Sequence, residues 1–110
     1  MILTVFRSRL KPTAVAEYGE WAARMSTLAR TMPGYISHKG FVADDGERVT
    51  IVEFESEEPV RNWSRNEEHS EAKKKGRADF YSEYRILTCT VQREMRFPRP
   101  NPDSASPAPN

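Results

Sequence analysis

Asp45 and Gly46 lie between two β-rich runs, YISHKGFV over 35–42 and RVTIVEF over 48–54. An Asp-Gly pair in this setting is a strong hairpin signal, because tight hairpin turns need residues that tolerate a positive φ. The hairpin places two antiparallel neighbours in the middle of the chain.

A strand and a helix are predicted before the hairpin. Residues 1–10 are β-rich, and Lys11-Pro12 ends the strand, with Thr13 as the expected N-cap of the helix. From about Ala14 to Met32, apolar residues recur at steps of three and four, which predicts an amphipathic helix that ends at Pro33-Gly34. The stripe consists of Val15, Tyr18, Ala22, Met25, Ala29 and Met32.

A second helical region and a last strand are predicted after the hairpin. Ser56 followed by Glu57-Glu58-Pro59 is typical of a helix N-terminus. Asn66 indicates a break, with a second helical piece over about 67–80. The last strand is predicted from about Tyr84 to Arg96, about twice the usual length of a strand. We therefore expect it to reach outside its own sheet.

The order βαββαβ predicts an α+β, ferredoxin-like fold, a four-stranded antiparallel sheet with helices on one face. Three strands carry apolar residues toward both faces, and no further element is left to cover the second face. We therefore expect a homodimer that packs sheet against sheet, with the last strand crossing to the partner. Residues 1–97 form the predicted domain, and the proline-rich residues 98–110 are expected to be an extended tail.

Charge and composition exclude several classes of partner. The chain has 17 basic and 16 acidic residues, a net charge of +1, which gives no reason to expect nucleic acid. No apolar run approaches the about 18–20 residues that cross a membrane. A single cysteine, Cys89, and no leader segment predict a cytoplasmic setting. No dinucleotide-binding loop and no Cys/His cluster is present, so neither cofactor nor metal is expected.

Five segments of the chain resemble the antibiotic biosynthesis monooxygenase (ABM) family. They are MILTVFRSRLKP, MPGYISHKGF, DDGERVTIVEFES, the pair Trp63 and His69, and GRADFYSEYRILTCTVQRE. The resemblance covers about residues 1–97 and implies a dimeric α+β barrel. The family includes cofactor-free oxygenases of polyketide anthrones and quinols, and also haem-degrading enzymes.

Two branches of the family make different demands on the residues. The haem-degrading pattern needs an Asn in the first strand and an axial His ten residues after the helix Trp, where this chain has Phe6 and Lys73. The anthrone-oxidising pattern has a Trp and, six positions later, a hydroxyl-bearing residue. Here Trp63 is kept and His69 takes the second place, while the Asn and Arg of that branch are not clearly matched. The resemblance therefore favours the oxygenase branch.

The resulting hypothesis is a cofactor-independent monooxygenase that oxidises an aromatic polyketide/anthrone- or quinol-like substrate with dioxygen in an apolar pocket. Its catalytic candidates are His69, as base or proton shuttle, and Trp63, because histidine titrates near neutral pH. The candidate substrate-binding residues are Phe6, Arg7, Trp21, Met25, His38, Phe80 and Tyr84.

Other interpretations of these residues stay open. His69 suits a helix surface or a helix cap, and Trp63 suits a hydrophobic core. His38 suits a hydrogen-bonded structural role, and Arg7 a salt bridge at the rim. The alternative function is a haem- or small-ligand-binding dimer without turnover. A third is a detoxifying enzyme or isomerase on the same scaffold.

Overall fold

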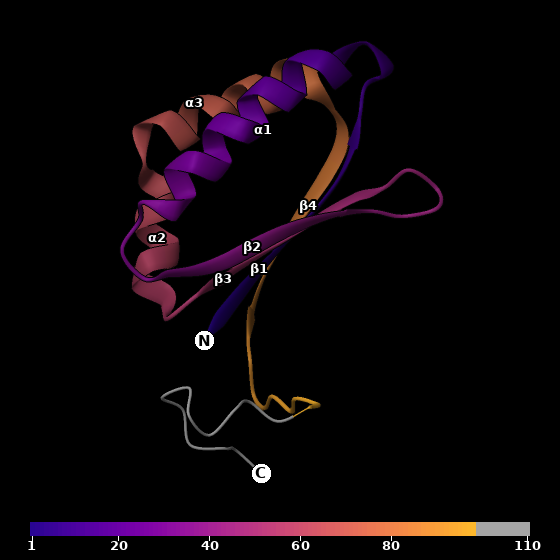
Figure 1. The fold of residues 1–110 in the computed structure, drawn as a ribbon. Helices are drawn as coiled ribbons and strands as arrows, with labels where there is room; N and C mark the ends of the chain where they lie inside the picture. The colour runs from indigo at the N-terminus through magenta and orange to yellow at the C-terminus, as the bar shows by residue number, and fades with distance from the viewer. Residues whose placement is uncertain (99–110) are drawn as a thin grey trace.

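The computed structural model describes residues 1–98, and all of the predicted tail except Pro98 lies outside the described residues. The predicted order of elements and the ferredoxin-like α+β fold are confirmed (Figure 1). The elements are β1 (Ile2–Leu10), the 3-10 turn η1 (Pro12–Ala14), α1 (Val15–Arg30), β2 (Tyr35–Val42), β3 (Arg48–Phe54), α2 (Glu57–Arg65), α3 (Glu67–Lys75), the π turn η2 (Gly76–Phe80) and β4 (Tyr81–Thr90).

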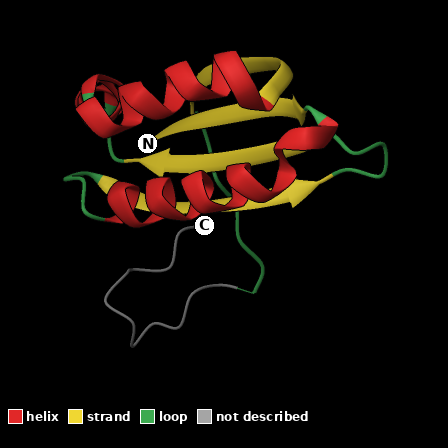
Figure 2. Cartoon of the chain, turned by 90° about the horizontal axis from the view of Figure 1, so that it is seen from above, coloured by secondary structure: helices red, strands yellow, loops and turns green. Residues whose placement is uncertain are grey.

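The four strands form one antiparallel sheet in the order β2-β3-β1-β4. The predicted hairpin joins β2 to β3, and Gly46 in its turn has a φ of 90°, as such a turn requires. Helices α1, α2 and α3 lie over the same face of the sheet (Figures 1 and 2). The described part of the chain places no helix on the other face, which is called the open face below.

The core lies between the helices and the sheet. Ile2 and Phe54 are paired across β1 and β3 and are both buried. Ala14 of η1, Ala29 of α1 and Phe80 of η2 are also buried. The predicted α1 stripe is wrong at its first member, because Val15 is 52% exposed. The turn η1 brings Ala14 to the inward position instead.

The last strand differs from its predicted bounds. It begins three residues earlier, at Tyr81, and ends at Thr90 rather than Arg96. The only neighbour of β4 in the sheet is β1, whose pairing ends where Ile2 meets Thr90. Val91 N still donates to Met1 O at 3.1 Å, and beyond this point the strand has no partner within the described chain. The pairing register, not local β propensity, therefore ends the strand.

The three helical starts predicted from the sequence differ in their caps. Thr13 lies inside η1, whose N-cap is Lys11. Ser56 stands at the N-cap of α2, but its side chain makes no capping hydrogen bond. Asn66 does cap α3, because its side chain accepts a hydrogen bond from His69 N. The predicted break between two helical pieces is thus confirmed.

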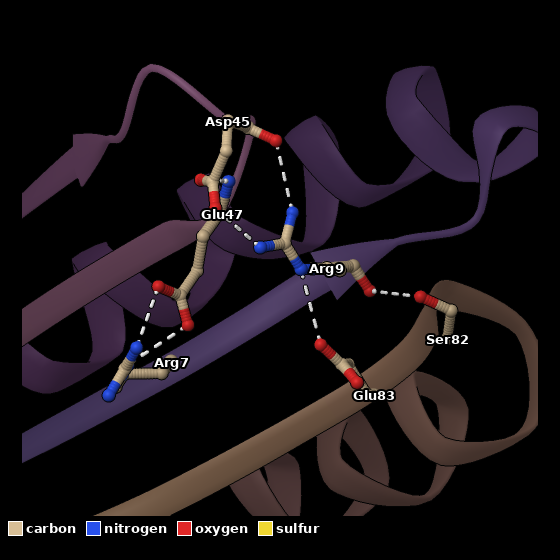
Figure 3. A network of polar contacts seen from close by, with 6 residues as sticks. All are labelled: Arg7, Arg9, Asp45, Glu47, Ser82 and Glu83. Carbon is tan, nitrogen blue, oxygen red and sulfur yellow. Dashed lines mark hydrogen bonds and ion pairs between the residues drawn. The ribbon is translucent and has the colours of Figure 1, made fainter.

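The open face has an apolar part and a charged part. The alternation of β1, β3 and β4 places Leu3, Val5, Val49, Ile51, Leu87 and Cys89 on it. In the charged part, Arg7 donates two hydrogen bonds of 2.9 Å to Glu47 (Figure 3). Arg9 binds Asp45 of the hairpin turn and Glu83 of β4. These ion pairs connect β1 to β4 and to the loop between β2 and β3 at one end of the face.

Candidate functional site

Trp63 and His69, the two catalytic candidates, lie in direct contact. Trp63 belongs to α2 and His69 to α3, and both side chains are half-buried. Their rings are stacked, with centroids 4.0 Å apart and planes 17° apart. The Nδ1 atom of His69 lies 2.9 Å from the carbonyl oxygen of Trp63. The helical break therefore brings together the two residues whose spacing identified them in the sequence.

This hydrogen bond determines which imidazole nitrogen of His69 carries the proton. A backbone carbonyl oxygen can only accept, so Nδ1–H must be the donor. In the neutral ring, Nε2 then carries the lone pair. Burial lowers the pKa of His69, the bond to Trp63 opposes this, and Lys73 lowers it further. His69 is thus a neutral ring at neutral pH, with Nε2 as its proton acceptor.

A group of aromatic rings lies elsewhere between the helices and the sheet, and we call it the aromatic cluster. It consists of Phe6, Tyr18, Phe80, Tyr81 and Tyr84, with neighbouring centroids 5.3–6.5 Å apart. Burial raises the pKa of Tyr81, so that its hydroxyl stays protonated. Three predicted substrate-binding residues, Phe6, Phe80 and Tyr84, are brought together here. Phe80 is 2% exposed and serves as core.

Two buried hydroxyls accompany the aromatic cluster. Thr4 Oγ1 and Ser8 Oγ have no hydrogen-bond partner among residues 1–98. Both stand two positions from Phe6 on β1 and share its face of the sheet. An unpaired buried hydroxyl costs about 1–3 kcal/mol. Neither hydroxyl was predicted from the sequence, where only the alternation of Thr4 and Ser8 with Phe6 indicates them.

His38 has partners at both ring nitrogens. Ser26 of α1 lies 2.8 Å from Nε2, and the hydroxyl of Tyr35 lies 2.6 Å from Nδ1. Burial lowers the pKa of His38, and Arg30 adds to the effect. The contacts tie the edge strand β2 to α1, as expected for a structural histidine. A substrate would have to displace one of the two hydroxyls to reach a ring nitrogen.

The remaining candidates do not join Trp63 and His69. Arg7 lies on the open face in its ion pair with Glu47, as the salt-bridge alternative expected. Trp21 is half-buried on α1, with the guanidinium of Arg24 4.6 Å from its ring centroid. Met25 is half-buried on the same helix. Arg7 and Trp21 therefore each have a charged partner of their own.

Two surface hollows are formed by other parts of the described chain. One is lined by residues within 23–31, from α1 and its C-terminal end, and by Glu68 of α3. The other lies over the charged part of the open face. Neither is lined by Trp63 or His69.

Residues 1–98 contain no group of three His, Cys, Asp or Glu side chains close enough to hold a metal ion. Over the same residues, no helix is both long enough and apolar enough to cross a membrane.

The chain is similar to proteins of one family. Residues 1–75 match the family model for antibiotic biosynthesis monooxygenase. The uncharacterized protein YqjZ of Bacillus subtilis (strain 168) is 32% identical over 93 residues, which are 84% of this chain and 82% of that protein.

Two solved structures have a similar fold. Rv0793 from Mycobacterium tuberculosis has a TM-score of 0.78 at 14% identity, over 86% of this chain and 98% of that one. SnoaB, a cofactor-independent oxygenase from Streptomyces nogalater, has a TM-score of 0.73 at 19% identity, over 88% and 96% of the two chains. At such identities the likeness shows the fold alone.

Proposed function

Since the chain belongs to the antibiotic biosynthesis monooxygenase family, we propose that it is a cofactor-independent monooxygenase in which His69 is the base. The substrate class we propose is an aromatic, reduced polyketide, an anthrone- or quinol-like molecule. The likeness to SnoaB, itself a cofactor-independent oxygenase, supports this reaction type. The observation that carries the proposal is the lone pair of His69 Nε2, which follows from the bond of Nδ1 to Trp63 O.

The proposed reaction begins with a proton transfer. Nε2 takes a proton from the substrate, which becomes an electron-rich carbanion, and the imidazolium keeps the proton. The carbanion passes one electron to dioxygen, and the resulting radical and superoxide combine into a carbon–oxygen bond. The imidazolium then protonates the peroxide. Loss of water from this hydroperoxide turns CH₂ and O₂ into C=O and H₂O, which balances atoms and electrons.

Trp63 supports the same chemistry through its ring. The indole lies flat against the imidazole of His69 and excludes water from one face of the imidazole. A drier setting favours the neutral imidazole, in agreement with the lowered pKa of His69. The planar stack also suits a planar aromatic substrate beside it. We assign Trp63 to orienting His69 and to substrate contact.

We further propose that the protein acts as a homodimer that buries the open face. Its apolar residues lie uncovered in the described chain, next to the ion pairs of Arg7 and Arg9. Residues 91–97 extend beyond the sheet, with Met95 85% and Phe97 96% exposed (Figure 1). A second copy would cover both surfaces if each 91–97 segment crossed to its partner.

The test is protein-dependent oxygen uptake with anthrone and with a dihydroquinone, each corrected for spontaneous oxidation. We expect uptake by the wild-type protein and a loss of roughly 100-fold or more in His69→Ala, as for removal of a general base. Arg61→Ala, an exposed substitution on α2, is the control and should keep the wild-type rate. Equal rates in wild type and His69→Ala would contradict the role of His69.

A haem titration tests the ligand-binding alternative in the same preparations. The lone pair of Nε2 is also a possible ligand for iron. A Soret band that is lost in His69→Ala, without oxygen uptake, would replace the oxygenase with a haem-binding dimer. No uptake with either substrate and no Soret band would remove both functions.

A further inference from the structure

We propose that Asn66 is a positioning residue that holds His69 in the Nδ1–H tautomer, with Nε2 as the proton acceptor. Asn66 lies at the junction of α2 and α3. The proposal rests on the proposed function, in which His69 is the base. The hydrogen bonds that position His69 do not involve a substrate. It assigns a function to the helical break itself.

The break frees the carbonyl group that binds His69. In an unbroken helix, the carbonyl of Trp63 would accept from the backbone N–H of Glu67, four residues on. Asn66 has a φ of −58° and a ψ of 133°, which is outside the helical region and turns the chain. Trp63 O accepts instead from Asn66 N at 3.2 Å and keeps a second lone pair. That lone pair accepts the proton of His69 Nδ1.

The side chain of Asn66 holds His69 from the other end. Its Oδ1 accepts from His69 N at 3.2 Å, the N-cap bond to the third residue of α3. The same histidine therefore has its backbone held by Asn66 and its ring held by Trp63, three residues before Asn66. Lys73 adds a tie across the junction, because its Nζ donates to Ser64 O at 2.9 Å.

Other ring states of His69 conflict with this arrangement. If Nε2 carried the proton, the lone pair of Nδ1 would face the lone pairs of Trp63 O, and the hydrogen bond would become repulsive. If the ring turned over, a C–H group would face the carbonyl and the bond would be lost. The indole of Trp63, stacked at 4.0 Å, restricts such rotation. The geometry therefore selects the tautomer that is less common in free histidine.

The test is ¹⁵N NMR of the imidazole nitrogens of His69 in the full chain at a pH where the ring is neutral. In the wild type, we expect a pyrrole-like signal for Nδ1 and a pyridine-like signal for Nε2. Asn66→Ala should give a mixture of tautomers. Asn66→Ser, which retains a capping oxygen, should keep the wild-type pattern. Asn62→Ala, on an exposed position of α2, is the matched control.

The oxygen-uptake assay adds a second readout. A misplaced base loses roughly ten- to a hundredfold in kcat, so Asn66→Ala should fall by this factor and Asn66→Ser should recover it. An Asn66→Ala variant with the wild-type ¹⁵N pattern would overturn the proposal. If Asn66→Ala does not fold, Asn66→Gly replaces it, because glycine keeps the backbone permissive at the break. A wild-type ¹⁵N pattern in Asn66→Gly would overturn the proposal in the same way.

The two proposals fail in different ways. A tautomer shift in Asn66→Ala without any oxygen uptake by the wild type supports Asn66 as the positioning residue and rejects the proposed function. Oxygen uptake that depends on His69 but not on Asn66, with unchanged ¹⁵N signals, rejects the positioning role alone.

Discussion

The two histidines of this chain differ in what their ring nitrogens meet. His38 has a hydroxyl at each nitrogen, from Ser26 and from Tyr35. His69 has a carbonyl at Nδ1 only, so its Nε2 has no partner among the described side chains. A residue with one nitrogen held and the other unengaged can transfer protons without breaking the contact that positions it. His69 therefore suits catalysis, and His38 suits packing.

Both histidines should make the stability of the protein depend on pH. Burial lowers each pKa below the ordinary value of 6.5. As the pH falls below that value, the unfolded chain binds protons first, so the free energy of unfolding should decrease until the lowered folded-state pKa is passed. The measurement is urea unfolding between pH 7.5 and 5 at one protein concentration.

The double variant His38→Gln/His69→Gln should show a much smaller slope over this range. The carboxylates of Asp45, Glu47 and Asp79 have pKa values lowered from 3.8, 4.5 and 3.8, so they act at lower pH. Gly19→Ala changes no titratable group and should keep the wild-type slope. Equal slopes in the wild type and the double variant would contradict the assignment to the histidines.

At the scale of elements, the junctions are more constrained than the helices and strands they join. Gly34 follows α1 with a φ of 84° and lies against Pro59 of α2. Asn66 separates α2 from α3, and Gly76 begins η2 in contact with the ring of Tyr81. These positions determine how the helices lie on the sheet. Substitutions there should matter more than most substitutions within the elements.

Three glycines provide a graded test of this expectation. Gly34→Ala should destabilise by about 2–4 kcal/mol, because its Cβ would overlap Pro59 and its φ is positive. Gly46→Ala, with a φ of 90° but open space, should lose only about 1–2 kcal/mol. Gly19→Ala, within α1 and with no atom within 4 Å, should gain about 0.5–1 kcal/mol.

Chemical denaturation of the three variants measures this order. Gly34→Ala and Gly46→Ala have similar φ values, so their difference isolates the contact with Pro59. If Gly34→Ala lost no more free energy of unfolding than Gly46→Ala, α2 would be free to move away from the added Cβ atom at this point.

At the scale of the whole molecule, the sheet is covered on one side only. The helices pack on one face, and the described chain offers the other face no cover (Figure 2). Its apolar part and the exposed Met95 and Phe97 are surfaces that a second copy would bury. The charged part, with Arg7 bound to Glu47, suits the rim of such an interface.

A charge placed on the open face should prevent the proposed dimer. Ile51→Glu lies opposite Val5 in the apolar part and would bury an unpaired carboxylate. We expect the wild type to have the mass of a dimer at micromolar concentration, and Ile51→Glu that of a monomer, by size-exclusion chromatography with light scattering.

Val42→Glu is the matched control for this experiment. It adds the same charge to β2 at a position that is 63% exposed on the helix-bearing side. It should leave the dimer intact. A monomeric wild type, or a dimeric Ile51→Glu, would contradict the sheet-to-sheet interface.

Features that depend on a few neighbouring residues can be predicted from the amino-acid sequence alone. The Asp45-Gly46 turn, the α1 stripe from Tyr18 onward and the break at Asn66 follow from φ preference, periodicity and capping. These local forces act within a turn or two of the chain. The pair Trp63 and His69 was identified through the resemblance to the family pattern, and the two rings meet because only six residues and one helical break separate them.

Features that join distant segments of the chain became visible only in the folded structure. The end of β4 at Thr90 depends on where β1 begins. The contact of Arg7 with Glu47, the two hydroxyls at His38 and the buried Thr4 and Ser8 depend on register and on which face is covered. The free lone pair of His69 Nε2 also could not be predicted from the sequence, because it depends on the direction of the carbonyl group of Trp63. Sequence patterns show which types of residue recur at a given spacing. The direction of a hydrogen bond is determined only when the chain has packed.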